Sequence, residues 1–244
     1  MRSNSTKTPV VILAAGRGSR LGELTQDKPK CLLDVAGVSM LERQLRSIEA
    51  VNKLSPVVVV TGFKHNLVTD AIDDSIVECY NREWDKANNI ASLGVAADAG
   101  WLDEGFVLFN SDVVFDVQIL ELLLSFERSN ALVVDNTQPM GAEEMKVDLD
   151  AAGRIVRIAK TLDPAMAAGE YIGLAKFDKD GAAALKSALG CLLGEGRRDE
   201  WYEAALQVMF AVHDVYPCYT EGRRWVEVDT PEDLGQANML FGEN

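Results

Sequence analysis

The residues best suited to chemistry in this chain of 244 residues lie in one short stretch, between Gly16 and Lys30. The loop Gly16–Arg20 combines small residues with two arginines. Small residues let backbone N–H groups approach a ligand closely, and arginine stays charged near neutral pH. The segment Lys28–Lys30 follows, with a proline between its two lysines. This pattern predicts a cradle for a phosphate group beside a second cationic site.

The spacing excludes two common nucleotide-binding loops. A dinucleotide fingerprint requires a third glycine where Leu21 stands, and a P-loop requires Gly-Lys followed by Ser or Thr, which is absent. The simpler alternative for Gly16 and Gly18 is a tight turn between a strand and a helix.

Carboxylates lie at the ends of two predicted strands. Asp112 follows the apolar strand 106–110, and Glu227 and Asp229 alternate along the strand that begins at Trp225, so they share one face. Mg²⁺ prefers one or two carboxylates together with phosphate oxygens and water. The alternative for Asp112 and Asp229 is that each caps the helix that follows it.

A resemblance to a known family rests on these motifs. Leu13–Leu21, followed by Pro29-Lys30-x-Leu-Leu, resembles the signature of the sugar-1-phosphate nucleotidyltransferase superfamily, which couples an NTP to a phosphorylated small molecule. Three further stretches resemble its phosphocholine and 2-aminoethylphosphonate cytidylyltransferase branch: Asn88–Leu93, Glu144–Val147 and Gly169–Gly173. The similarity runs from about Val10 to about Leu240.

The resemblance implies a Mg²⁺-dependent enzyme that transfers CMP from CTP to a small phosphate or phosphonate and releases pyrophosphate. Because nucleotidyl transfer needs positioning and charge neutralisation more than covalent help, we assign no nucleophile to the protein. The predicted catalytic residues are Arg17, which steadies the departing phosphates, and Lys30, which holds the α-phosphate. The resemblance assigns metal ligation to Asp112 and Asp229, with Glu227 as an outer partner.

Two further groups of residues are expected to bind the substrates. Those expected at the nucleotide are Leu13, Ala14, Ala15, Gly16, Gly18, Thr61, Gly62, Asn88, Asn89 and Ser92. Those expected at the acceptor are Lys146 and Lys160 for its phosphate, and Glu170, Tyr171, Trp201 and Glu203 as an acidic and aromatic pocket for a cationic amine. The alternatives are a helix cap for Asn88, an exposed strand face for Lys146, and core packing for Tyr171 and Trp201.

Alternating strands and helices must position these residues. Strands are expected at 10–13, 56–61, 76–80, 106–110 and 131–134, and helices at 40–51, 64–73, 89–99 and 117–128. Continuous apolar strands between helices predict a Rossmann-like (GT-A-like) α/β fold, whose mostly parallel central sheet is covered by helices on both faces. Ligands bind at the carboxyl ends of the strands in such sheets.

The pattern changes after residue 136. We expect a β-hairpin at 145–160 that leaves the main sheet, a strand at 170–177, helices at 181–193 and 198–210, strands at 214–218 and 225–228, and a C-terminal helix from residue 231. Residues 1–8 are expected to form a disordered tail, and 9–244 a single domain. Within it, 9–136 would bind the NTP, 137–225 would bind the acceptor through a small β-rich insert, and 226–244 would supply a metal ligand and the last helix.

Composition limits the partners and the compartment. The net charge of −14 argues against nucleic-acid binding and requires a local cationic site for any triphosphate. Four cysteines without zinc-ligand spacing predict reduced thiols. The lack of a signal peptide and of an apolar run of about 20 residues predicts a cytoplasmic protein without a membrane span. The oligomeric state is open, with a homodimer as one option.

Two other functions stay open at this stage. One is a sugar-1-phosphate nucleotidyltransferase that uses UTP, GTP or ATP. The other is a nucleotide-sensing domain without catalysis, because a fold alone does not imply an activity. The joint presence of Arg17, Lys30, Asp112 and Asp229 favours an enzyme over the sensing domain.

Overall fold

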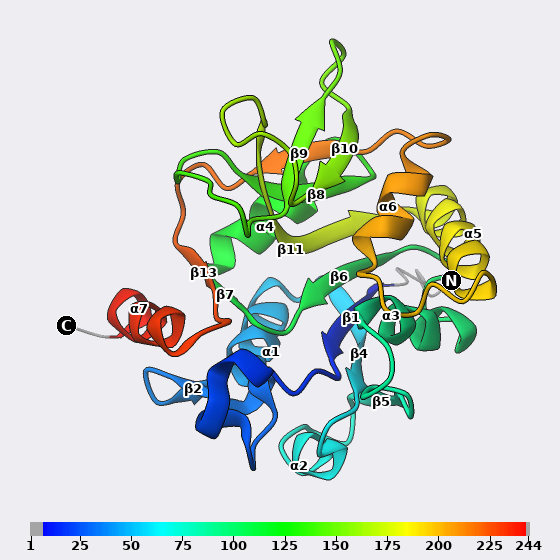
Figure 1. Ribbon diagram of the computed structural model, residues 1–244. Helices are drawn as coiled ribbons and strands as arrows, with labels where there is room; N and C mark the ends of the chain where they lie inside the picture. Colours follow the sequence, from blue (N-terminus) through cyan, green and yellow to red (C-terminus); the bar gives the residue numbers. More distant parts are fainter. Residues whose placement is uncertain (1–6, 243–244) are drawn as a thin grey trace, which may run out of the picture.

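The computed structural model of the chain describes residues 7–242 and is built around a nine-stranded sheet (Figure 1). The strands are β1 (Thr8–Ala14), β4 (Leu54–Thr61), β5 (Val77–Tyr80), β6 (Phe106–Asn110), β8 (Ala131–Asp135), β9 (Lys146–Leu149), β10 (Ile155–Ala159), β11 (Gly169–Phe177) and β12 (Tyr216–Tyr219). Their order is β10-β9-β11-β6-β1-β4-β5, with β8 paired to β11 and to β12.

The parallel part of the sheet is the part that the apolar strands predicted. Strand β1 pairs in parallel with both β4 and β6, and β4 pairs in parallel with β5. Strand β11 is antiparallel to β6, β8 and β9. The prediction of an α/β fold with a central, mostly parallel sheet is confirmed, and the antiparallel strands gather on one side of it.

Helices cover both faces of the sheet, because successive side chains of a strand point to opposite sides. Val11 and Leu13 of β1 pack in one core cluster with α3 (Asn89–Asp98), α5 (Lys179–Gly194) and α6 (Glu203–Met209). Val10 and Ile12 pack in a second cluster with α1 (Met40–Val51) and α4 (Val117–Ser125). The sheet is therefore the middle of three layers.

A smaller two-stranded sheet lies beside the main one. Strand β7 (Val113–Phe115) pairs antiparallel with β13 (Trp225–Glu227), and α7 (Pro231–Phe241) follows β13. The remaining short elements are β2 (Asp34–Val35), β3 (Val38–Ser39), the 3-10 turns η1 (Ser19–Thr25) and η2 (Lys30–Leu32), and α2 (His65–Thr69). A third apolar cluster joins η1, β2, β7, β13 and α7.

Several predicted boundaries were wrong. The β9–β10 hairpin does not leave the main sheet, because the backbone of Val147 and Lys146 pairs with β11. The helix expected at 198–210 is limited to α6, since the backbone N–H of Tyr202 donates to the Asn89 side chain rather than to a helical carbonyl. The helices expected at 64–73 and 117–128 are also shorter, as α2 and α4.

Of the predicted disordered tail at 1–8, only residues 7 and 8 can be compared with the structure. Residues 1–6 lie outside the described residues, Lys7 donates a hydrogen bond to Asn52 Oδ1 at 2.7 Å, and Thr8 begins β1. All four cysteines fall within the described part and carry free thiols. From residue 7 to residue 242, no helix has both the length and the apolarity needed to cross a membrane.

Candidate active site

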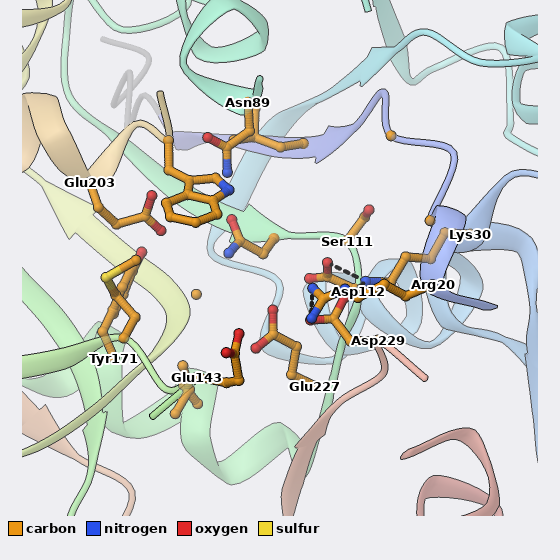
Figure 2. Close-up of a pocket in the computed structure, with 18 of the residues that line it drawn as sticks. Arg20, Lys30, Asn89, Ser111, Asp112, Glu143, Tyr171, Glu203, Glu227 and Asp229 are labelled. Atoms are coloured by element: carbon orange, nitrogen blue, oxygen red, sulfur yellow. Dashed lines mark hydrogen bonds and ion pairs between the residues drawn. The ribbon is translucent and has the colours of Figure 1, made fainter. Parts of the chain in front are cut away.

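A cleft of about 870 Å³ opens at the carboxyl ends of β1 and β6. Its walls are the loop after β1, the start of α3, the first half of β11 and the segment around β13. Figure 2 shows that the labelled side chains form two groups. Arg20, Lys30, Asp112 and Asp229 lie at one end, and Tyr171 and Glu203 lie at the other.

The loop after β1 forms one wall of the cleft. Leu13, Ala15, Gly16 and Gly18 line it, as predicted for a phosphate cradle. Gly18 has a φ of +76°, and a Cβ at this position would lie 2.9 Å from Lys30 Cβ. Only glycine allows the loop to pack this closely against the lysine stem.

The pairing of β7 with β13 brings three carboxylates together. Asp112 immediately precedes β7, and its carbonyl accepts a hydrogen bond of 2.9 Å from the backbone N–H of Val228. One carboxylate oxygen from each of Asp112, Glu227 and Asp229 lies within 4.8 Å of the other two. Thr230, rather than Asp229, caps α7, so neither Asp229 oxygen is used as a helix cap.

Two cations neutralise this trio in the structure. Lys30 Nζ lies 2.8 Å from Asp112 Oδ2 and also pairs with Asp229 Oδ1, while Arg20 pairs with Asp229 Oδ2 (Figure 2). Burial alone would lower the pKa of Lys30, but the charges of Asp112 and Asp229 raise it above its ordinary value. Burial would likewise raise the pKa of Asp229, yet the two cations hold it below its usual range.

Glu227 is the third member of the trio. It remains accessible to solvent through the mouth of the open cleft. Partial desolvation in the cleft and the charges of Asp112 and Asp229 raise the pKa of Glu227 above its ordinary value. A positive charge placed among these carboxylates would favour their ionised forms.

The trio fits a divalent cation. Carboxylate oxygens are the ligands that hard cations such as Mg²⁺ prefer. Asp112 Oδ1 is buried and has no hydrogen-bond partner within the described residues, so this oxygen is available to ligate an ion. Asp112 and Asp229 were predicted as ligands, and the structure places Glu227 beside them.

The start of α3 supplies amide and hydroxyl groups to the cleft. Asn88, Asn89 and Ser92 all line it. Asn88 Oδ1 accepts from the backbone N–H of Asn89 at 2.8 Å, so the helix-cap alternative is also realised. Asn89 Oδ1 accepts from Tyr202 N, and Ser92 Oγ accepts from Asn81 Nδ2 at 3.0 Å. The Asn89 amide nitrogen is left to face the cleft (Figure 2).

The other end of the cleft is acidic and aromatic. Lys160 Nζ lies 4.9 Å from the centre of the Trp201 ring and 3.4 Å from Glu143 Oε2. Glu170 also lines this end, and burial, with the charges of Glu144 and Asp135, raises its pKa to about 7. Trp201 is 46% exposed, so its ring is not packed in the core.

Tyr171 and Glu203 line the floor of this acidic end, and Tyr202 packs against Tyr171. Tyr171 and Tyr202 are buried with their hydroxyl oxygens 2.9 Å apart, and the Tyr202 hydroxyl also donates to Asn110 Oδ1 at 3.1 Å. Glu203 is buried, and within the residues that the structure describes its Oε2 finds no hydrogen-bond partner. Burial raises the pKa of Glu203 to about 7.

Five predicted site residues do not line the cleft: Arg17, Ala14, Thr61, Gly62 and Lys146. The guanidinium of Arg17 lies over the Phe63 ring, 5.4 Å from its centre. Thr61 is fully buried and donates its hydroxyl hydrogen bond to Glu78 on β5, and Ala14 is buried in the second core cluster.

The other two of these residues are enclosed by local structure. Gly62 packs so tightly that a Cβ would lie 2.5 Å from Trp84 Cβ. Lys146 is 0% exposed, and its Nζ donates to the carbonyls of Gly141 and Glu144, both at 2.9 Å. The structure therefore contradicts the exposed-face alternative for Lys146 and gives its ammonium group two backbone partners away from the cleft lining.

Several residues that line the cleft were given no individual role from the sequence, among them Arg20, Trp84 and Glu143. For Arg20 a signal was present, because it lies in the same basic loop as Arg17. For Trp84 and Glu143 the sequence offered no motif, since both are on irregular segments.

The chain matches a known family and is similar in sequence to two longer proteins. Residues 10–192 match the family model described as a MobA-like NTP transferase domain. A bifunctional IPC transferase and DIPP synthase of Rubrobacter xylanophilus is 30% identical over 91% of this chain and 49% of its own length. A CMP-5'-(3-aminopropyl)phosphonate synthase of Streptomyces rubellomurinus is 29% identical over 95% of this chain and 38% of its own length. The chain thus spans about half, or less, of these two relatives.

A shorter relative and two solved structures complete the comparison. A choline-phosphate cytidylyltransferase of Haemophilus influenzae is 30% identical over 61% of this chain and 60% of its own length. The CTP:phosphocholine cytidylyltransferase of Streptococcus pneumoniae has a TM-score of 0.77 at 16% identity, over 96% of this chain and 98% of that one. The inositol-1-phosphate CTP transferase of T. maritima has a TM-score of 0.76 at 20% identity, over 98% of each chain. At such identities the two structures show the fold alone.

Proposed function

The chain belongs to the MobA-like NTP transferase family, and from this premise we propose that it transfers CMP from CTP to a small phosphate or phosphonate acceptor, releasing pyrophosphate. The observation that carries the proposal is the division of one cleft into two ends. One end holds two cations and three carboxylates, and the other holds an exposed indole among glutamates. Such a cleft suits a triphosphate and a small zwitterionic acceptor bound side by side.

The nucleotide end would neutralise and orient the triphosphate. Lys30 would hold the α-phosphate as charge builds on it, while backbone N–H groups at Gly16 and Gly18 cradle the chain of phosphates. Arg20, which lines the cleft where Arg17 does not, would take the departing pyrophosphate. Asn88, Asn89 and Ser92 would face the base or the ribose, as the sequence predicts.

Asp112, Glu227 and Asp229 would hold a Mg²⁺ ion in this end. A bound Mg²⁺ ion neutralises phosphate charge and fixes the geometry of an in-line displacement. The orphaned Oδ1 of Asp112 and the short distances within the trio support this assignment.

The acceptor end suits an amine. The Trp201 face attracts a cation through its ring quadrupole, and Glu143 and Glu170 supply negative charge. Lys160, the one predicted phosphate ligand of this end that lines the cleft, would contact the acceptor's phosphate or phosphonate. An oxygen of that group would attack the α-phosphorus of CTP, forming a P–O bond while the bond to the β-phosphate oxygen breaks and pyrophosphate leaves.

The names of the relatives support a cytidine nucleotide and leave a choice of acceptor. The relatives named for aminopropylphosphonate, phosphocholine and 2-aminoethylphosphonate fit the acidic end, whereas the solved structure named for inositol 1-phosphate takes an acceptor without an amine. We favour the amine because the exposed ring of Trp201 and the carboxylates of Glu143 and Glu144 line this end of the cleft.

Pyrophosphate release tests the proposal. The protein is supplied with Mg²⁺ and each of CTP, UTP, GTP and ATP, and each nucleotide is paired with phosphocholine, 2-aminoethylphosphonate, inositol 1-phosphate or glucose 1-phosphate. Release with CTP and an amine acceptor is expected. Release only with glucose 1-phosphate would establish a sugar-1-phosphate nucleotidyltransferase instead, and no release with any pair would favour a nucleotide-sensing domain.

Three further predictions from the sequence accompany this function. The first is a cytoplasmic location, which the four free thiols support. The second is a homodimer, which light scattering can test. The third is a division of the chain into a nucleotide-binding part (9–136) and an acceptor-binding part (137–225). Strands on both sides of residue 136 line the one cleft, so the two parts would share the site rather than hold separate ones.

A further inference from the structure

The ammonium group of Lys30 stands where a divalent ion would be held. Its Nζ lies 2.8 Å from Asp112 Oδ2 and also contacts Asp229 Oδ1 (Figure 2). The lysine side chain is nearly enclosed, with 9% of its surface exposed, and its stem packs under Gly18. The Lys30 side chain is therefore held in one position by packing and ion pairs, unlike a lysine on an exposed surface.

Three of the four carboxylate oxygens that Asp112 and Asp229 offer to an ion are already paired. Of the four carboxylate oxygens of Asp112 and Asp229, two contact Lys30 and a third contacts Arg20. The fourth, Asp112 Oδ1, is the buried orphan. A divalent ion and an ammonium group cannot share the same oxygens at contact distance, because like charges this close repel strongly in a partly buried site.

From this geometry we propose that Lys30 is an internal counter-ion that keeps the divalent-cation site closed until a triphosphate draws the lysine away. The proposal rests on the proposed function, since it takes the nucleotide end of the cleft as the place where phosphates bind. A triphosphate supplies anionic oxygens that compete for the ammonium group of Lys30 and for Arg20. Once these two cations turn to the phosphates, Asp112 and Asp229 can ligate the ion.

The arrangement makes metal and nucleotide binding interdependent. The free protein binds a divalent ion weakly, because the ion must first displace Lys30. Bound triphosphate removes that obstacle, and by linkage the ion strengthens nucleotide binding by the same factor. Metal then enters the cleft together with the substrate that needs it.

The test is the affinity of Mn²⁺ for the nucleotide-free protein, measured by electron paramagnetic resonance. Lys30→Met removes the charge but keeps an unbranched stem, and it is expected to tighten Mn²⁺ binding about tenfold or more. Lys28→Met is the matched control: Lys28 is two residues away, 41% exposed, and pairs with Asp34 at 3.2 Å instead of with the trio. It is expected to leave the Mn²⁺ affinity within about twofold of the parent, since exposed charges are screened.

A second measurement uses the parent protein alone and does not depend on the variant's folding. Thermal unfolding is followed with Mn²⁺, with α,β-methylene CTP, and with both together. The proposal predicts a small rise in unfolding temperature with Mn²⁺ alone, and a rise with both that exceeds the sum of the separate rises.

Two results would overturn the proposal. One is a Lys30→Met protein that is folded by circular dichroism and binds Mn²⁺ no tighter than the parent. The other is a parent protein that Mn²⁺ alone stabilises as much as Mn²⁺ with the analogue. Neither experiment contains an acceptor or requires turnover, so a failure of the proposed transferase activity would be seen separately, in the pyrophosphate assay.

Discussion

Replacing Glu203 by glutamine should raise the free energy of unfolding relative to the parent protein. This gain should be larger at pH 8 than at pH 5. Glu203 is 8% exposed, lies on the floor of the acidic end of the cleft, and has a pKa raised by burial from its ordinary 4.5 to about 7. A shift of this size corresponds to about 3 kcal/mol between the protonated and the ionised side chain. Glutamine has the same shape and cannot ionise.

The sign follows from where the proton is held. Below pH 4.5 both the folded and the unfolded chain keep the proton on Glu203, and the side chain costs no stability. Between pH 4.5 and about 7 the unfolded chain releases the proton while the folded protein retains it, so the free energy of unfolding falls as the pH rises. Above about pH 7 the loss is complete. Between pH 5 and pH 8 the advantage of Glu203→Gln over the parent should therefore grow by about 2 to 3 kcal/mol.

Urea denaturation of both proteins at the two pH values measures this difference. Glu49→Gln, at an exposed position of α1, is the control and should follow the parent at both pH values. If the Glu203→Gln advantage were the same at pH 5 and pH 8, the pKa of Glu203 would not be raised in the folded protein. The description of a dry, acidic floor beneath the acceptor would then be incorrect.

Three other substitutions, the first with a matched control, test separate features of the structure. Gly18→Ala places a side chain at positive φ, as does its control Gly153→Ala, and each should lower the free energy of unfolding in urea by about 1–2 kcal/mol. Only Gly18→Ala, whose Cβ would clash with Lys30, should also raise the KM for CTP. Trp201→Leu should raise the KM for an amine acceptor by about 5- to 30-fold while leaving the KM for CTP unchanged, because it removes the cation–π face; an equal rise in both constants would contradict this. Lys146→Met should lower the free energy of unfolding by about 1–3 kcal/mol, since the charged hydrogen bonds from Lys146 to the carbonyls of Gly141 and Glu144 are lost. An unchanged stability together with a raised acceptor KM would instead indicate that Lys146 binds the acceptor.

The sequence predicts the parallel core of the fold because its signals are local. Helix α1 matches its predicted bounds: Ser39 caps its start by accepting from the backbone of Glu42, and Asn52 ends it in the left-handed conformation. Strand β6 also matches, as an apolar run directly after Gly105. The resemblance to nucleotidyltransferases, read from the loop after β1, is confirmed by the family match over residues 10–192.

Elements that depend on distant partners could not be predicted in the same way. Strand β7 has only three residues and exists because β13, far along the chain, pairs with it. This pairing sets the distance between Asp112 and Asp229, so the sequence could nominate the two carboxylates but could not show that Glu227 joins them.

The sequence also could not show which of several neighbouring basic side chains reaches the cleft. Arg17 and Arg20 lie in one basic loop, and the turn of η1 after Gly18 directs Arg20 to Asp229 while Arg17 lies over Phe63. Lys146 is covered because residues 141 to 144 fold back over it and place two carbonyls at its ammonium group. No spacing rule reports such a backbone contact.

The transfer of label from [α-³²P]CTP tests the central claim most directly, namely that Lys30 and the carboxylate trio act on a triphosphate in one cleft. With Mg²⁺ and 2-aminoethylphosphonate or phosphocholine, the parent protein should move the label into a phosphatase-resistant phosphoanhydride. Folded Lys30→Met should do so at least about 100-fold more slowly, as expected for the loss of a cation that stabilises developing charge. Label transfer at the parent rate by Lys30→Met, or no labelled phosphoanhydride from the parent with either acceptor, would contradict the account.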